Sequence, residues 1–233
     1  MNLFENLYKT LIYDNRYLFF LEGIKNTIII AFFAKSLTPS SLGVIIGIII
    51  AIVKNYHEKT NKLKILNFLA LCYVNIIRGT PTILQLMIIY YVIFASVEIN
   101  IVFVGILAFG INSGAYVSEI IRAGINSIDK GQIEAGSSLG LNYPQIMRYI
   151  IMPQAIKNIL PALGNEFITL VKETSVGAYI GIIELTKASD IVASRTYEYF
   201  FPLIIAAIIY LIITLSLSKL ISIMERKLNN ANS

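Results

Sequence analysis

Long apolar runs constrain this chain more than any other feature of its sequence. Of its 233 residues, 56% are hydrophobic and only 14% are charged, whereas soluble domains carry about 25% charged residues. A helix needs about 20 consecutive apolar residues to cross a bilayer core, because no water is available there for its backbone. The sequence therefore predicts an all-α integral membrane protein, with one transmembrane domain over residues 1–233. Five runs are long enough to cross, at about residues 22–53, 65–96, 100–127, 150–172 and 201–224.

Polar residues and prolines interrupt the first two runs. In the first, Lys35 and residues 38–41 fall near the centre, and each half is too short to cross alone, so we expect one kinked helix. In the second, Pro81 removes a backbone donor and Gly79 frees the backbone. We therefore expect a turn at the membrane surface before Pro81, with Arg78 at the cytoplasmic end of the span, and a crossing helix after it.

Lysine and arginine are concentrated in three connections, and this predicts an orientation. They are Lys54, Lys59, Lys62 and Lys64 after the first run, Arg122, Lys130 and Arg148 between the third and fourth, and Arg226 and Lys227 after the fifth. Cytoplasmic loops are enriched in these residues, and five spans place all three connections on one side. The N-terminus is then outside and the C-terminus cytoplasmic. The connection 173–201 is outside as well, and we expect a short helix there, packed at the outer surface.

The connection between the third and fourth runs contains the most informative motif. Residues 131–142 predict a short helix over 132–139 that ends at Gly140, because glycine adopts the left-handed conformation that closes many helices. Pro153 then marks the entry into the fourth run. An exposed helix of this kind either only joins two spans or inserts into a groove of a soluble partner.

With its flanking residues, this segment resembles the cytoplasmic signature of permease subunits of bacterial binding-protein-dependent ABC importers, in their polar amino acid branch. That signature is Glu-Ala-Ala, three residues, Gly, nine residues, then Ile-x-Leu-Pro. The chain matches it at Glu134, Ala135, Gly140, Ile150 and Pro153, with Gly136 for the second alanine and Met152 for the leucine. Further matches lie at Gly23, Thr27, Tyr73, 78–81, 113–116, Glu119, Arg122, 131–132, 153–155, Asn165 and 172–175.

The resemblance implies a MetI-like permease fold in the bacterial cytoplasmic membrane. It implies that two such subunits, identical or related, form the pathway, and that helix 131–142 docks into a cytoplasmic ATPase subunit that binds ATP and Mg. An external solute-binding protein would deliver the amino acid, and ATP-driven closure of the ATPases would rock the spans between inward-open and outward-open states. The inward direction of transport rests on the resemblance alone. The residues that it assigns to ATPase coupling are Gly131, Gln132, Glu134, Ala135, Gly136, Leu139, Gly140 and Pro153.

Polar residues inside the third and fourth runs are candidates for the substrate pathway, because such residues usually face a cavity or a partner helix. They recur at helical spacing, as Asn112, Tyr116 and Glu119 on the third run and Asn165, Thr169, Lys172 and Glu173 on the fourth. Facing cations and anions can bind the carboxylate and ammonium of an amino acid. Alternatively, these groups link helices to one another or reach the membrane surface. Glu166 is a further candidate on a different face from Asn165.

Other function classes lack the residues that they need. A single Cys72 and a single His57 cannot supply the roughly four ligands of a Cys/His metal site. The sequence has no Gly-x-x-x-x-Gly-Lys-Ser/Thr loop for nucleotide phosphates and no basic patch with interleaved aromatics for nucleic acid. We therefore expect no catalytic, metal or cofactor site in this chain. The alternative is an ion-coupled secondary transporter that uses Glu119 or Glu173, although such carriers usually have more spans and inverted repeats.

Overall fold

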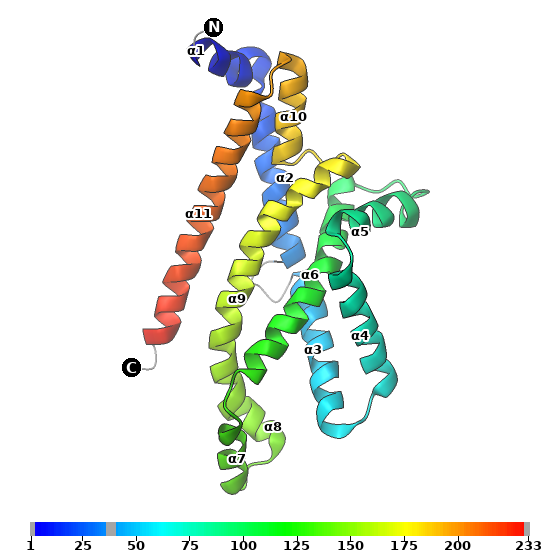
Figure 1. The fold of residues 1–233 in the computed structure, drawn as a ribbon, viewed down its shortest axis with the longest axis vertical. Coiled ribbons are helices and arrows are strands. Elements are labelled where there is room, and N and C mark those ends of the chain that lie inside the picture. Colours follow the sequence, from blue (N-terminus) through cyan, green and yellow to red (C-terminus); the bar gives the residue numbers. More distant parts are fainter. Residues whose placement is uncertain (1–2, 36–40, 231–233) are drawn as a thin grey trace.

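The structure, a computed structural model, describes residues 3–35 and 41–230 as an elongated bundle of helices (Figure 1). In chain order these are α1 (Leu3–Leu7), the π-helix η1 (Tyr8–Ile12), the 3-10 helix η2 (Tyr13–Asn15), α2 (Tyr17–Lys35), α3 (Leu42–Thr60), α4 (Lys64–Gly79), α5 (Thr82–Ile88), the π-helix η3 (Ile89–Ile93), α6 (Ile101–Asn126), α7 (Lys130–Ser138), α8 (Tyr143–Ile146), the π-helix η4 (Met147–Ile151), α9 (Met152–Glu173), the 3-10 helix η5 (Thr174–Ile180), α10 (Leu185–Thr196) and α11 (Phe200–Asn230).

Helices α2, α6 and α11 are long and apolar enough to cross a membrane, and α4 with α5–η3 would make a fourth span bent by 111°. Helices α3 and α9 are more polar. One charged side chain of each pairs with a residue on another helix: Lys54 of α3 pairs with Glu119 of α6, and Glu166 of α9 pairs with Lys35 of α2. Pairing of this kind is what allows charged helices inside a membrane bundle.

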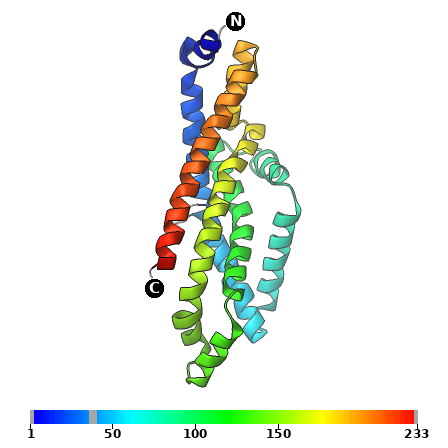
Figure 2. The same cartoon turned by 60° about the vertical axis from the view of Figure 1, so that its left-hand side comes forward.

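Two helices, α2 and α3, occupy the region of the first run. They lie end to end in both views of the bundle (Figures 1 and 2), and they extend over residues 17–35 and 42–60. The apolar run at 22–53 is shorter because α3 continues into the polar residues 54–60, and because Glu22 and Lys25 separate the apolar residues 17–21 at the start of α2 from the rest of the run. Of the expected break at 38–41, only residue 41 is among the described residues.

The expectation of a surface turn in the second run is wrong. The residues before Pro81 form the 16-residue helix α4, which buries Ala70 and Val74. After Pro81, α5 and η3 have seven and five residues, about 18 Å of helix, which is too short to cross about 30 Å of hydrocarbon. Arg78 does not mark an end of the bundle either, because its guanidinium lies 3.8 Å from Glu119 within α6.

The predicted helix in the connection between the third and fourth runs is α7. It ends as expected, since Gly140 has a φ of 79° and the backbone nitrogen of Leu141 donates to the carbonyl of Gly136 at 3.1 Å. This left-handed closure satisfies carbonyls that would otherwise be free at the end of the helix.

The connection between α9 and α11 also contains the expected short helix, α10. It packs against α2 and α11, and its Leu185, Ala188 and Val192 are fully buried. Together with α1, it forms the end of the bundle opposite α7 and the α3–α4 turn (Figure 1).

Small residues hold α3 and α6 close together. Gly43 and Gly47 of α3 are four residues apart, as are Gly110 and Gly114 of α6, a spacing that lets membrane helices approach closely. A Cβ on Gly47 would lie 2.4 Å from Cγ1 of Val117. The two backbones can therefore be this close only if these positions have no side chain.

Replacing Gly47 with alanine is expected to lower the thermal unfolding temperature of the detergent-solubilised protein. Overpacking costs about 1–3 kcal/mol, or about 2–12 °C for a chain of this size, and circular dichroism can follow the loss of helix. Gly79→Ala is the control, because a Cβ there meets no atom within 4 Å. Equal unfolding temperatures for the two variants would contradict this account of the α3–α6 contact.

Candidate transport pathway

A group of three charged residues and one tyrosine, the Lys35 cluster, lies where α2, α6 and α9 meet. It consists of Lys35, Tyr116, Glu166 and Glu173. The side chain of Lys35 is only 3% exposed, and its ammonium lies 2.6 Å from Oε1 of Glu166. Glu173, two turns further along α9, interacts electrostatically with both of them. The ammonium pairs with Glu166, and Glu173, which also interacts with the exposed Lys172, adds a second carboxylate. Lys35, Glu166 and Glu173 together therefore have a net negative charge.

A second group, the Glu119 cluster, consists of Lys54, Arg78, Glu119 and Arg122. The Glu119 carboxylate lies 2.6 Å from Nζ of Lys54, 2.9 Å from Nη2 of Arg122 and 3.8 Å from Nη1 of Arg78. Three cations surround one carboxylate, so this cluster has a net positive charge.

Tyr116 connects the two clusters. Nζ of Lys35 lies 5.8 Å from the centroid of its ring, and the guanidinium of Arg78 lies 5.7 Å from it. Both distances are within the range of cation–π contacts. The two groups of opposite net charge are therefore neighbours within the bundle.

A cavity of about 300 Å³, wide open to the surface of the bundle, lies beside the Glu119 cluster, between α3, α4 and α6. Its volume is at the lower end of the range for ligand pockets, about 300–1,000 Å³. The cavity is thus large enough for a small solute. Its charged lining residues are Lys54, Glu58, Arg78, Glu119 and Arg122.

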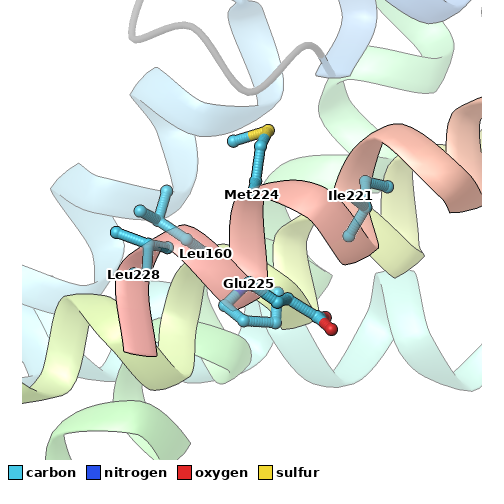
Figure 3. Close-up of a pocket in the computed structure, with 6 residues that line it drawn as sticks. Leu160, Ile221, Met224, Glu225 and Leu228 are labelled. Carbon is cyan, nitrogen blue, oxygen red and sulfur yellow. The ribbon is translucent and has the colours of Figure 1, made fainter. Parts of the chain in front are cut away.

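The contact between α9 and α11 also encloses a small pocket. Leu160 of α9 and Ile221, Met224 and Leu228 of α11 line it, with Glu225 beside them (Figure 3). Its volume is about 10 Å³, about the space that one water molecule needs. It is therefore too small to hold an amino acid.

The structure separates the candidate pathway residues into two groups. Tyr116, Glu119 and Glu173 belong to the clusters. Asn165 and Lys172 are exposed, and the Thr169 hydroxyl donates to the carbonyl of Asn165 at 3.1 Å. Of these neighbouring positions on α9, Glu166 is the one that reaches Lys35.

Asn112 connects α6 to the break between α4 and α5. Its amide nitrogen donates to Oε1 of Gln85 at 2.9 Å, and Nε2 of Gln85 donates to the carbonyls of Ile77 and Thr80 at 2.7 and 3.1 Å. The Asn112 side chain thus links helices, which is the alternative role considered for these residues.

Sequence reasoning missed several residues that the fold brings together. In the sequence, Lys35 is only an interruption in an apolar run and Lys54 only a loop charge, although a lysine in a membrane span calls for a carboxylate partner. Buried Glu184 gives no sequence signal at all. Its carboxylate accepts from the backbone nitrogens of Thr186 and Lys187 and from the hydroxyl of Tyr210 at 2.8 Å, and so joins α10 to α11.

The segment assigned to ATPase coupling lies at one end of the bundle (Figure 1). Helix α7 rests on α8 and η4, and a Cβ on buried Gly136 would lie 2.9 Å from Cγ1 of Ile146. Leu139 is 80% exposed. The other residues assigned to coupling, Gly131, Gln132, Glu134, Ala135, Gly140 and Pro153, are exposed as well.

Tyr143 ties this segment to α3. Its hydroxyl donates to Oδ1 of Asn55 at 3.1 Å, and the ammonium of Lys59 lies 4.9 Å from the centroid of its ring. Burial raises the pKa of the Tyr143 phenol above its ordinary value. The hydroxyl therefore stays protonated at neutral pH and can donate this hydrogen bond.

A helical bundle with paired charges inside and an exposed short helix at one end defines the class, an integral membrane permease. Residues 43–230 match the family described as the inner membrane component of binding-protein-dependent transport systems, and the chain belongs to this family.

Relatives and solved structures agree with this. The chain is 42% identical over 213 residues to a putative glutamine transport system permease protein of Rickettsia typhi (91% of this chain, 93% of the relative). It is 39% identical over 214 residues to an arginine transport system permease protein of Bacillus subtilis (91% and 93%). A crystal structure of an amino acid ABC transporter with histidines aligns with a TM-score of 0.81 and 45% identity (91% of this chain, 94% of that one). An inward-facing methionine ABC transporter, with a TM-score of 0.68 and 21% identity over 93% and 97% of the two chains, supports the fold alone.

The chain is therefore the permease subunit of a bacterial amino acid ABC importer, with the MetI-like fold that the motif predicted. The ion-coupled carrier is not favoured.

Replacing Lys35 with methionine is expected to destabilise the bundle, because Glu166 loses its cation. Breaking a buried pair costs about 3 kcal/mol, or about 6–12 °C in unfolding temperature, measured in detergent by circular dichroism. Adding Glu166→Gln is expected to restore part of the loss. Lys9→Met is the control, since Lys9 pairs with Glu5 at 3.7 Å on an exposed surface, where such pairs contribute little. Equal effects of Lys35→Met and Lys9→Met would contradict this view.

Proposed function

We propose that the amino acid passes through the bundle beside α3, α6 and α9, between the Lys35 cluster and the Glu119 cluster. The observation that supports this is the contact of two clusters of opposite net charge through Tyr116, next to a cavity of about 300 Å³. An amino acid carries an ammonium and a carboxylate, which suit the negative and the positive cluster respectively.

The energy comes from a partner that docks on α7. This helix is at one end of the bundle, and Leu139 is 80% exposed there, as in helices that insert into a groove of another protein. The partner is a cytoplasmic ATPase subunit that binds ATP and Mg. A second permease subunit, identical or related, completes the pathway, and an external solute-binding protein delivers the amino acid.

The end of the bundle with α7 and the α3–α4 turn faces the cytoplasm. Lysine and arginine are concentrated in both connections, as expected of cytoplasmic loops, and the two lie together in the fold (Figure 1). The N-terminus is then outside and the C-terminus cytoplasmic.

The substrate is a polar amino acid. The relatives are named for glutamine and arginine, and the similar solved structure was obtained with histidines. These three differ in side-chain charge. Glu173 interacts electrostatically with Glu166, Lys35 and Lys172, and we assign its carboxylate as the group that favours a cationic side chain.

Purification of the tagged chain from its native membrane in mild detergent is expected to bring down an ATPase. Leu139→Asp is expected to reduce the co-purified ATPase activity at least about tenfold, because the docking groove would have to accept a carboxylate without a partner. Tyr197→Asp is the control, since Tyr197 is 96% exposed at the opposite end. If Leu139→Asp retains the ATPase, docking through α7 is wrong, and if the unaltered chain purifies alone, the ATP-driven mechanism is wrong.

Glu173→Gln is expected to shift the substrate preference of the reconstituted importer. With the carboxylate gone, uptake of arginine should fall about tenfold relative to glutamine, the equivalent of one lost charge interaction of about 1.4 kcal/mol. Uptake of labelled glutamine, arginine and histidine into proteoliposomes measures the ratio. Exposed Glu98 provides the control Glu98→Gln, and an unchanged ratio in Glu173→Gln would leave Glu173 a structural role only.

A further inference from the structure

Tyr143 makes a long-range contact and belongs neither to the two charged clusters nor to the exposed surface of α7. It lies 88 residues from its hydrogen-bond partner Asn55, and it is half-buried between α8 and the end of α3. Lys59, one turn beyond Asn55 on α3, covers its ring. The side chain therefore bridges the segment that follows α7 and a helix of the transport pathway.

Local hydrogen bonds hold the chain between α7 and Tyr143 in place. The backbone nitrogen of Leu141 is bonded to the carbonyl of Gly136 at 3.1 Å. Asn142 and Gln145 form a reciprocal capping box at the start of α8, with hydrogen bonds of 2.9 and 3.1 Å. Because Gly136 also packs directly on Ile146, α7 and α8 move together.

The covalent route from α8 into α9 is less direct. The π-helix η4 follows α8, and Pro153 stands in the first turn of α9. A π-helix and a proline both interrupt the regular hydrogen bonds through which a straight helix transmits a displacement.

Asn55, the partner of Tyr143 on α3, lies next to a residue of the proposed pathway. Asn55 follows Lys54, whose ammonium lies 2.6 Å from Glu119, and glycines fix α3 against α6. A displacement of Tyr143 therefore reaches α3 and α6, which carry Lys54, Glu119 and Arg122.

We propose that the hydrogen bond from Tyr143 to Asn55 is the positioning contact that transmits the ATPase-driven movement of α7 to α3 and on to the Glu119 cluster. This rests on the proposed docking of the ATPase at α7. Tyr143 and Asn55 touch neither substrate nor nucleotide in this mechanism, so their loss affects the coupling of the two reactions and spares ATP hydrolysis itself.

The test is the number of amino acid molecules transported per ATP hydrolysed. The chain is reconstituted in proteoliposomes with its co-purified ATPase and binding protein, and with whichever of glutamine, arginine and histidine it transports. Tyr143→Phe keeps the ring and removes the donor. Its transport per ATP is expected to fall about 2- to 10-fold, as for one lost hydrogen bond, while its ATPase activity and unfolding temperature stay close to those of the unaltered chain.

Asn55→Leu removes the acceptor and tests the same bond from the other side, so that misfolding of one variant does not decide the outcome. The double variant is expected to fall no further than either single one, because both remove one interaction. Asn55→Asp keeps an acceptor oxygen and is expected to retain coupling. Tyr149→Phe is the matched control, since Tyr149 follows in the same segment but is 65% exposed.

Two results would overturn the proposal. One is an unchanged ratio of transport to hydrolysis in both Tyr143→Phe and Asn55→Leu. The other is an equal fall in transport per ATP in Tyr149→Phe, which would mean that any change of a tyrosine in this segment disturbs its packing. Both differ from failure of the proposed function, in which the unaltered chain would not retain an ATPase through α7.

Discussion

The ammonium of Lys35 is the group on which the interior of this bundle depends. A charged group that is 3% exposed inside a membrane protein needs a counter-charge, so α9 must bring Glu166 to the end of α2. That contact fixes the rotation of α9 and therefore the direction in which Glu173 points. It also brings Tyr116 of α6 beside the ammonium. One buried lysine thus links three helices of the bundle.

The two clusters along the proposed pathway have net charges of opposite sign. The Lys35 cluster has an excess of one carboxylate and the Glu119 cluster an excess of cations. Their contact through Tyr116 lets each excess offset the other at short range, where the low dielectric constant makes such interactions strong. In the proposed pathway, a zwitterion between the clusters would find both signs of charge already in place and held by packed helices.

Sequence alone could predict what depends on local chemistry. The apolar runs indicate the helices, and Gly140 indicates where α7 ends, because backbone freedom and hydrophobicity are properties of single residues and short windows. The pairing of Lys35 with Glu166 depends instead on how helices far apart in the chain pack. Asn165 and Glu166 point about 100° apart around α9, and only the contact with α2 determines which of them faces inward. The sequence does not predict helix α4, because Gly79 and Pro81 indicate an interruption of the second run. These residues lie at and just after the C-terminal end of α4, where they end the helix but do not prevent the residues before them from forming it.

The bend between α4 and α5 constrains how the chain is made. Neither half is long enough to cross the membrane by itself, at about 24 and 18 Å, and the polar groups at the bend are satisfied by Gln85, which is itself held by Asn112. Asn112 lies on α6 and leaves the ribosome after both halves. Until it arrives, Oε1 of Gln85 lacks this donor, and the bend would expose that polar group to lipid. It follows that α4 and α5 cannot settle into the bilayer one at a time, and that their insertion is completed only together with α6.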